Sequence, residues 1–385
     1  MHHPTGSAII GAVRRRLVVL PALALVLAAC GADGAVVLEP SAPLSPTSAA
    51  PAATATPSPT GPGEVAAPQV AETVVTGLTS PWGLAFLPDG TALVSERDTA
   101  RVLRVVDGEP RPVGAVPDVV TGGEGGLLGL AVPAGDARWV YAYHTASGGN
   151  QVVRMPWDGS TLGEPEVVLA GIPSSAVHNG GRLAFGPDGM LYVTTGDARD
   201  TALSPDPDSL AGKILRLTPD GEVPPDNPDP ASPVLSSGHR NVQGIAWDAD
   251  GRLWASEFGA NTWDELNAIT PGADYGWPSV EGAGGAEQGY VDPLVQWPTD
   301  QASPSGIAIA EGTVYVAALR GQRLWAVPVG GGRAGEPEAF LTGELGRLRT
   351  VAQAPDGSLW LVTSNTDGRG AVRDGDDRIL RLTLG

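Results

Sequence analysis

Pro187-Asp188-Gly189, followed by Met190-Leu191-Tyr192-Val193, is the stretch that decides the fold. Asp-Gly supplies the residue with positive φ that a tight hairpin turn needs. The four residues after the turn then read as a short, aromatic-containing strand. An apolar run at residues 182–185 precedes the turn, and a third apolar run follows at residues 213–217. The stretch therefore predicts an antiparallel sheet built from short consecutive strands.

The same unit recurs along the chain. Copies of the turn and strand begin at residues 88, 187, 249, 311 and 355, with a weaker copy at residue 135. A spacing of roughly 45 to 60 residues is typical of propeller blades, each of which covers its neighbour once the ring closes. The six units predict an all-β, six-bladed β-propeller rather than a β-sandwich, which would not repeat so regularly. The last strand, residues 378–382, completes a blade begun near the N-terminus or closes its own blade.

The composition supports an all-β fold and argues against some classes of binding partner. The 385 residues include 53 Gly and 36 Pro, which favour turns over long helices. The net charge of −19 opposes binding to nucleic acid and to anionic lipid headgroups. A neutral or cationic small molecule is the favoured partner.

The N-terminus reads as an export signal. Arg14, Arg15 and Arg16 precede an apolar run at residues 17–27, which is too short for an ordinary transmembrane helix. Cys30, the only cysteine, ends a Leu-Ala-Ala-Cys stretch that resembles the bacterial lipobox. We expect residues 1–30 to be a lipoprotein signal peptide, and a plain signal peptide with a chance cysteine is the alternative. The expected location is the outer face of the bacterial cell membrane, or the periplasm or extracellular space, with membrane contact only through the lipid anchor.

Residues 31–70 are rich in Ala, Pro, Ser and Thr and poor in large apolar side chains. Such a segment buries too little surface to offset the entropy lost on ordering. We therefore expect a flexible tether over residues 31–70, and a folded propeller domain over residues 71–385.

Three loop motifs make the sequence specific. They are His178-Asn179-Gly180-Gly181-Arg182-Leu183 with a later Gly196-Asp197, then Gly238-His239-Arg240-Asn241-Val242-Gln243-Gly244, and then Asp274-Tyr275-Gly276-Trp277-Pro278. In that order they resemble the family of soluble quinoprotein glucose and aldose sugar dehydrogenases, over about residues 73–385. The resemblance implies a six-bladed propeller that oxidises aldose sugars at C1 to lactones. It also implies pyrroloquinoline quinone (PQQ) and Ca²⁺ as cofactors, and an external electron acceptor.

Three residues match the catalytic positions of that family. His178 matches the base, which removes the anomeric hydroxyl proton as hydride leaves C1, a task that suits a neutral imidazole. Asp197 matches the carboxylate that orients this histidine. Arg240 matches a contact to the quinone, where a fixed cation can stabilise developing negative charge.

Further residues match the cofactor and metal positions of the family. The expected cofactor contacts, besides His178 and Arg240, are Glu124, Asn241, Arg320, Arg347 and Arg349. Glu124 stands where the best-known members have a glutamine, and Arg320 where they have a lysine. The backbone carbonyls of Gly259 and Ala260 match ligands of the cofactor calcium. Glu265 and Tyr275 match ligands of a second calcium, to which Glu281 is a further candidate ligand.

Two other functions stay open at this point. A calcium-dependent lactonase on the same kind of propeller would need Glu, Asn and Asp side chains that converge on the channel axis. A non-catalytic propeller that binds sugar or protein would have no use for a base beside a group of arginines. The sequence does not identify the sugar.

Overall fold

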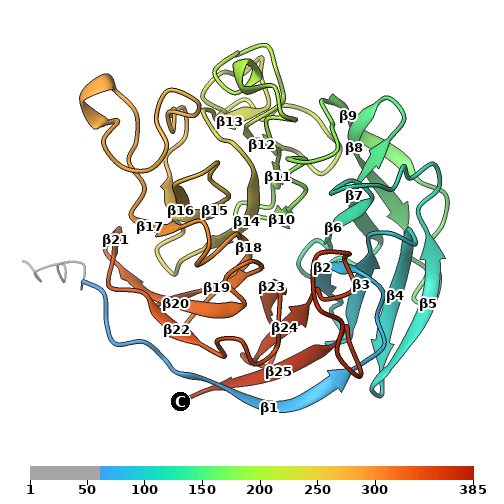
Figure 1. Cartoon of the computed structure of the whole chain (residues 1–385). Coiled ribbons are helices and arrows are strands. Elements are labelled where there is room, and N and C mark those ends of the chain that lie inside the picture. Colours follow the sequence, from blue (N-terminus) through green and yellow to red (C-terminus); the bar gives the residue numbers. More distant parts are fainter. Residues whose placement is uncertain (1–60) are drawn as a thin grey trace, which may run out of the picture. The chain divides into compact units, whose positions relative to one another are not determined.

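The computed structural model describes residues 61–385, so the predicted signal peptide, Cys30 and most of the predicted tether lie outside the described residues. Within unit Pro57–Gly385, six antiparallel sheets surround a central axis (Figure 1). This confirms the predicted all-β, six-bladed propeller. No helix among the described residues is both long enough and apolar enough to span a membrane.

Each blade is a meander that runs from the axis outward. The first three blades contain β2(Pro81–Phe86), β3(Ala92–Glu96), β4(Arg101–Val106) and β5(Glu109–Ala115); β6(Leu127–Ala131), β7(Trp139–Ala146), β8(Gly149–Pro156) and β9(Glu166–Ile172); and β10(Leu183–Phe185), β11(Leu191–Thr194), β12(Ile214–Leu217) and β13(Val234–Ser236). The next two contain β14(Val242–Trp247), β15(Leu253–Glu257), β16(Trp263–Ile269) and β17(Val295–Pro298); and β18(Pro304–Ala310), β19(Thr313–Ala318), β20(Arg323–Gly330), β21(Arg333–Ala334) and β22(Glu338–Phe340). Two short 3₁₀ turns, η1(Thr201–Leu203) and η2(Ala286–Gln288), lie in loops.

The sixth blade closes the ring with both ends of the domain. Its order from the axis is β23(Leu348–Gln353), β24(Leu359–Thr363), β25(Ile379–Leu384) and then β1(Pro68–Val75). The C-terminal strand therefore closes its own blade, and the N-terminal strand completes that blade from outside. In Figure 1, β1 (blue) and β25 (red) run side by side.

The start of the folded domain differs from the sequence expectation. β1 begins at Pro68, and Ala67 pairs with Gly385 through backbone hydrogen bonds. Val65 packs against an apolar cluster of the last two blades, and the Tyr315 hydroxyl donates to the Ala66 carbonyl (2.5 Å). The boundary predicted at residue 70 is therefore too late. Pairing with β25 orders a segment whose own composition does not indicate a strand.

Local sequence explains the blades. The turn glycines Gly90, Gly189 and Gly357 have φ values of 83°, 76° and 85°, in the left-handed region that favours glycine. Near the axis, Gly129 and Gly244 leave no room for a side chain, because an added Cβ would lie 2.3 Å from a backbone carbonyl of the next blade. Backbones of neighbouring blades can therefore pack closely around the axis, and the loops at one end of the blades surround the candidate site.

Candidate active site

His178 and Asp197 form the contact that the motif predicts. His178 lies in the loop between β9 and β10, and Asp197 follows β11. The His178 Nδ1 lies 2.7 Å from the Asp197 Oδ1, and the Asp197 side chain is almost fully buried. Burial alone would raise the pKa of Asp197. Hydrogen bonds from His178, from the Arg199 amide and from the Trp277 indole outweigh burial and hold this pKa below its usual value.

The other ring nitrogen of His178 faces a guanidinium. The Arg240 Nη2 lies 3.0 Å from the His178 Nε2. Because arginine can only donate hydrogen bonds, Nε2 must be the accepting nitrogen and Nδ1–H must be the donor to Asp197. This network assigns a neutral imidazole whose lone pair is on Nε2, the protonation state that a general base requires.

Arg240 is held from several sides. Its amide donates to the Glu257 carboxylate, its Nη1 donates to the Phe258 carbonyl (3.1 Å), and its guanidinium lies 5.5 Å from the Trp277 ring centroid. Burial lowers the pKa of Arg240. Its Nε is buried without a hydrogen-bond partner among the described residues. Nη1 is thus held by the backbone, whereas Nη2 contacts only His178 among the described residues and Nε remains an unsatisfied donor.

A polar cavity of about 180 Å³ contains most of the predicted cofactor contacts. Four arginines and one carboxylate contribute to its wall, namely Arg320, Arg347, Arg349, Arg369 and Glu124. Gln243, Phe258, Ser303 and Leu319 complete the wall. The structure therefore brings Arg320, Arg347, Arg349 and Glu124 together, although they come from three different blade regions. Four guanidinium groups against one lining carboxylate make the cavity suitable for an anion.

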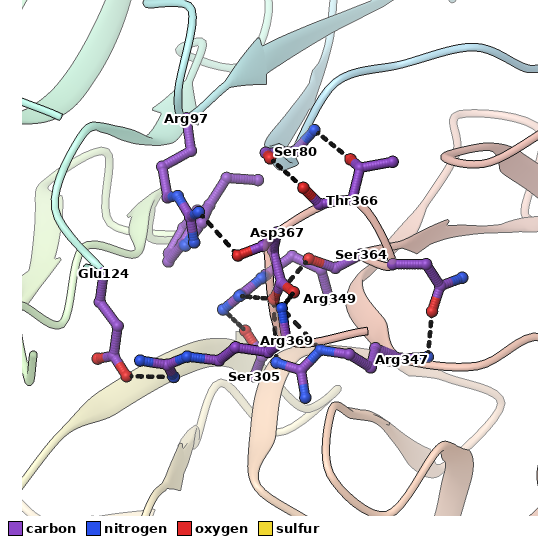
Figure 2. Close-up of polar contacts among 12 residues, drawn as sticks. Ser80, Arg97, Glu124, Ser305, Arg347, Arg349, Ser364, Thr366, Asp367 and Arg369 are labelled. Carbon is purple, nitrogen blue, oxygen red and sulfur yellow. Dashed lines mark hydrogen bonds and ion pairs between the residues drawn. The ribbon is translucent and has the colours of Figure 1, made fainter. Parts of the chain in front are cut away.

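Asp367 holds two of these arginines from behind (Figure 2). Its Oδ2 accepts hydrogen bonds from the Nε and Nη2 of Arg347 and lies 3.6 Å from the Arg349 Nη2. Arg349 also donates to the Gln243 side chain (2.9 Å), and its Nε is buried without a partner among the described residues. Arg347 and Arg349 therefore lie side by side at fixed positions.

Asn241 and Glu124, two of the predicted cofactor contacts, both support the loop that carries His178. Asn241 is fully buried and is not part of the cavity wall. Its Oδ1 accepts the Gly180 amide (3.0 Å), which helps to shape the loop that carries His178. Glu124 accepts the His178 amide on Oε2 (2.9 Å) and the Arg369 guanidinium on Oε1 (2.8 Å).

Three further residues of the site were not predicted from the sequence, namely Asp367, Arg369 and Trp277. Arg369 and Asp367 lie in the loop between β24 and β25, far along the chain from the three motifs. The only sequence signal for Trp277 was its place in the third motif, which gives no role. Contacts over such separations become visible only once the ring is closed.

The loop that carries Gly259 and Ala260 is organised by Glu281. One oxygen of Glu281 accepts the four consecutive amides of residues 260–263, at 2.7 to 3.2 Å. Carbonyl i and amide i+1 of a trans peptide point in opposite directions, so the Gly259 and Ala260 carbonyls point away from Glu281. Both carbonyl oxygens can therefore act as ligands of a metal ion.

The side chains of Glu265 and Tyr275, the predicted ligands of a second calcium, make hydrogen bonds within the protein. Glu265 accepts the Gly282 amide (2.8 Å) and the Asn267 side chain (3.0 Å), and burial raises the pKa of Glu265. The Tyr275 hydroxyl donates a hydrogen bond to the Ala268 carbonyl (2.7 Å). The backbone carbonyl oxygen of Tyr275 therefore remains as its possible ligand for a metal ion. Across residues 61–385, no three or more His, Cys, Asp or Glu side chains are arranged to hold a metal ion. Glu265 and Tyr275 nevertheless line one small cavity together with Gly259, Glu257 and Glu281, so the second calcium stays a prediction.

Comparisons with known proteins agree with the motifs. The sequence model of the family described as Glucose / Sorbosone dehydrogenase matches residues 78–380. The aldose sugar dehydrogenase YliI of Escherichia coli is 30% identical over 330 residues, which cover 76% of this chain and 89% of that protein. The PQQ-bound structure of aldose sugar dehydrogenase from Streptomyces coelicolor is 57% identical, with a TM-score of 0.81 and coverage of 85% of this chain and 100% of that chain. A glucose dehydrogenase structure from Thermus thermophilus is 47% identical, with a TM-score of 0.77 and coverage of 82% and 100%.

Proposed function

The chain belongs to the glucose/sorbosone dehydrogenase family of oxidoreductases, and from this premise we propose that it is a PQQ-dependent aldose sugar dehydrogenase that converts sugars to lactones. One observation carries the proposal: the neutral His178, oriented by Asp197, lies beside Arg240 and close to an arginine-lined cavity.

The residues of the cavity fit PQQ. PQQ is a planar tricarboxylate, and bound at this site it would supply a quinone carbon that accepts hydride. Arg347, Arg349 and Arg320 would hold its carboxylates. The unsatisfied Nε atoms of Arg240 and Arg349 are buried donors that an anionic ligand could satisfy.

His178 performs the proton transfer in this proposal. The C1 hydroxyl of the sugar displaces Arg240 from the His178 Nε2 and gives its proton to that nitrogen, while C1 loses hydride and becomes the lactone carbonyl carbon. Asp197 stabilises the imidazolium that forms, because it is ionised and hydrogen-bonded to Nδ1. The displaced Arg240 guanidinium can then stabilise negative charge on a nearby oxygen.

We assign one calcium ion to the same site. The carbonyls of Gly259 and Ala260 would be its protein ligands, since Ca²⁺ accepts uncharged carbonyl oxygens. Gly259 lines a small cavity together with Arg240 and with the acidic side chains of Glu257, Glu265 and Glu281. The ion would act as a Lewis acid on the bound cofactor.

Cellular context forms part of the proposal. Export and lipid attachment at Cys30 would place the enzyme outside the cell membrane, where it would transfer electrons to an external acceptor. The tether would separate the propeller from the lipid. The strongly acidic surface is consistent with a partner other than nucleic acid.

Product analysis tests the chemistry. The chain is incubated with PQQ, Ca²⁺, an artificial electron acceptor and glucose, and the sugar products are identified by mass spectrometry under conditions in which lactones survive. We expect a lactone two hydrogens lighter than the sugar. Products oxidised at another carbon would overturn the assignment of C1.

A lactonase is the weaker alternative. It needs converging metal-ligating side chains, and the described residues present four converging arginines instead. A parallel incubation with lactone in place of glucose distinguishes the two, because a lactonase would hydrolyse the lactone without consuming the electron acceptor.

A further inference from the structure

We propose that Arg369 is a positioning residue that neutralises Glu124, and that this ion pair allows a glutamate to stand in a pocket for an anionic cofactor. The inference rests on the proposed function, because it concerns the same cavity. Both residues line that cavity, and they are separated by 245 positions in the chain.

Glu124 contacts both functional parts of the site. Its Oε1 accepts Arg369 (2.8 Å) and its Oε2 accepts the His178 amide (2.9 Å). Burial alone would raise the pKa of Glu124. The hydrogen bonds from the His178 amide and from Arg369 outweigh it and hold this pKa below its usual value. The carboxylate is therefore ionised, and it braces the backbone of the proposed base, where φ is 60°.

Asp367, which binds Arg347 in the wall of the cavity, also orders the loop that carries Arg369 (Figure 2). The Asp367 Oδ1 accepts the Arg369 amide (2.9 Å), while its Oδ2 binds Arg347. Asp367 thus fixes the direction of Arg369 and the position of Arg347 together. The Arg369 side chain is about half exposed and reaches from this loop of the last blade to Glu124.

The negative charge of Glu124 would affect the binding of an anionic cofactor. An unpaired carboxylate in this cavity would repel the carboxylates of the cofactor, with little solvent to screen them. The pair with Arg369 removes that repulsion and keeps the contact to His178. A glutamine at position 124 would also keep that contact through its side-chain oxygen, without needing a cation. Arg369 is therefore required because residue 124 is Glu.

Titration of the apoprotein with PQQ, without sugar, tests this through a double-mutant cycle. Arg369→Gln should weaken PQQ binding roughly 10-fold, because it leaves the Glu124 carboxylate unpaired beside the carboxylates of the cofactor, while the half-exposed position of Arg369 limits the effect. Glu124→Gln alone should leave the Kd within about 3-fold of wild type. Glu124→Gln/Arg369→Gln should recover most of the lost affinity. Arg369→Lys, which keeps the charge, should bind much better than Arg369→Gln.

Arg111→Gln is the matched control, since it removes the same charge from an exposed side chain on β5. Thermal melting of each variant checks that the fold persists, which we expect because Arg369 is half exposed. Equal binding by Arg369→Gln and wild type would overturn the inference, as would additive losses in the double variant. Absence of PQQ binding by the wild-type chain would instead overturn the proposed function, and this inference with it.

Discussion

Asp197 determines which nitrogen of His178 carries the proton. It accepts Nδ1–H and leaves Nε2 as the base, as the contact to Arg240 also requires. An asparagine can present its N–H₂ group to Nδ1 and so favour the wrong tautomer. We therefore expect Asp197→Asn to lower kcat roughly 10²- to 10⁴-fold, the range that such tautomer errors cause.

Steady-state kinetics with PQQ titrated separately checks this prediction. The Kd for PQQ should stay near the wild-type value, because Asp197 does not line the arginine cavity. Trp277→Phe is the control, since it removes the indole hydrogen bond to Asp197 but keeps an aromatic ring near Arg240, and it should cost much less. An unchanged kcat in Asp197→Asn would contradict the assigned role.

His144 on β7 makes the fold sensitive to acid. Burial lowers its pKa to about 4, and its Nδ1 has no partner among the described residues. The unfolded chain binds this proton near pH 6.5 and the folded chain only near pH 4. Acidification across that window therefore favours unfolding, by at most on the order of 3 kcal/mol from this group.

Denaturant unfolding at pH 7 and at pH 4.5 measures the effect. We expect wild type to lose more free energy of unfolding between these pH values than His144→Gln does. Carboxylates that titrate in the same range contribute equally to both proteins, so the difference between the two belongs to His144. Identical losses in the two proteins would refute the prediction.

The sequence motifs predicted some side-chain contacts of the site and not others. The first motif predicted His178 with Asp197, and the structure places them 2.7 Å apart. The three motifs could not predict that Arg240 contacts Nε2, or that Glu124 pairs with Arg369, because both contacts depend on side chains from separate blades. The engaged hydroxyl of Tyr275 was equally hidden, since it depends on the local path of one turn.

At the level of elements, the loop at residues 259–263 depends on Glu281. Glu281→Ala leaves four amides without their shared acceptor and should lower the free energy of unfolding by roughly 1 to 3 kcal/mol. It should also raise the Ca²⁺ concentration needed for reconstitution, because the Gly259 and Ala260 carbonyls lose their alignment.

Thermal melting and a calcium titration measure both effects. Glu281→Gln keeps an accepting oxygen and should be affected less. The exposed Glu287 in η2 provides a control, and Glu287→Ala should match wild type. If Glu281→Ala behaves like that control, the loop is organised by other contacts.

The blades themselves were predictable because one local rule repeats. In three blades, the aspartate of the Asp-Gly turn pairs with an arginine of the third strand, as Asp188 does with Arg216 (3.0 Å). The corresponding pairs are Asp89 with Arg104 and Asp356 with Arg381. The boundary at Pro68 was not predictable, because β1 is specified by β25 and not by its own pattern.

At the level of the whole molecule, β1 closes the propeller. It pairs with β25 from Pro68 to Val75, and the buried Val75 packs between the last and first blades. A chain that starts at Gly77 loses this strand and the contacts of Val65. We expect its free energy of unfolding to fall by roughly 2 kcal/mol or more, the contribution of the buried Val75 and the partly buried Val65.

Calorimetry of chains that start at Gly61, Ala71 and Gly77 tests this closure. The melting temperature should fall in that order, because the second start removes three residues of β1 and the third removes the strand. Equal melting of the three chains would mean that the ring is stable without the N-terminal strand.

We propose that the propeller is an aldose dehydrogenase with PQQ as its cofactor and His178 as its base. The most direct measurement is dye reduction with a panel of aldoses, using residues 61–385 reconstituted with PQQ and Ca²⁺, beside His178→Ala. We predict reduction that requires both an aldose and PQQ and is lost in the variant, although the variant still binds PQQ. Wild-type protein that binds PQQ but reduces no dye with any aldose, or a fully active His178→Ala, would contradict the account.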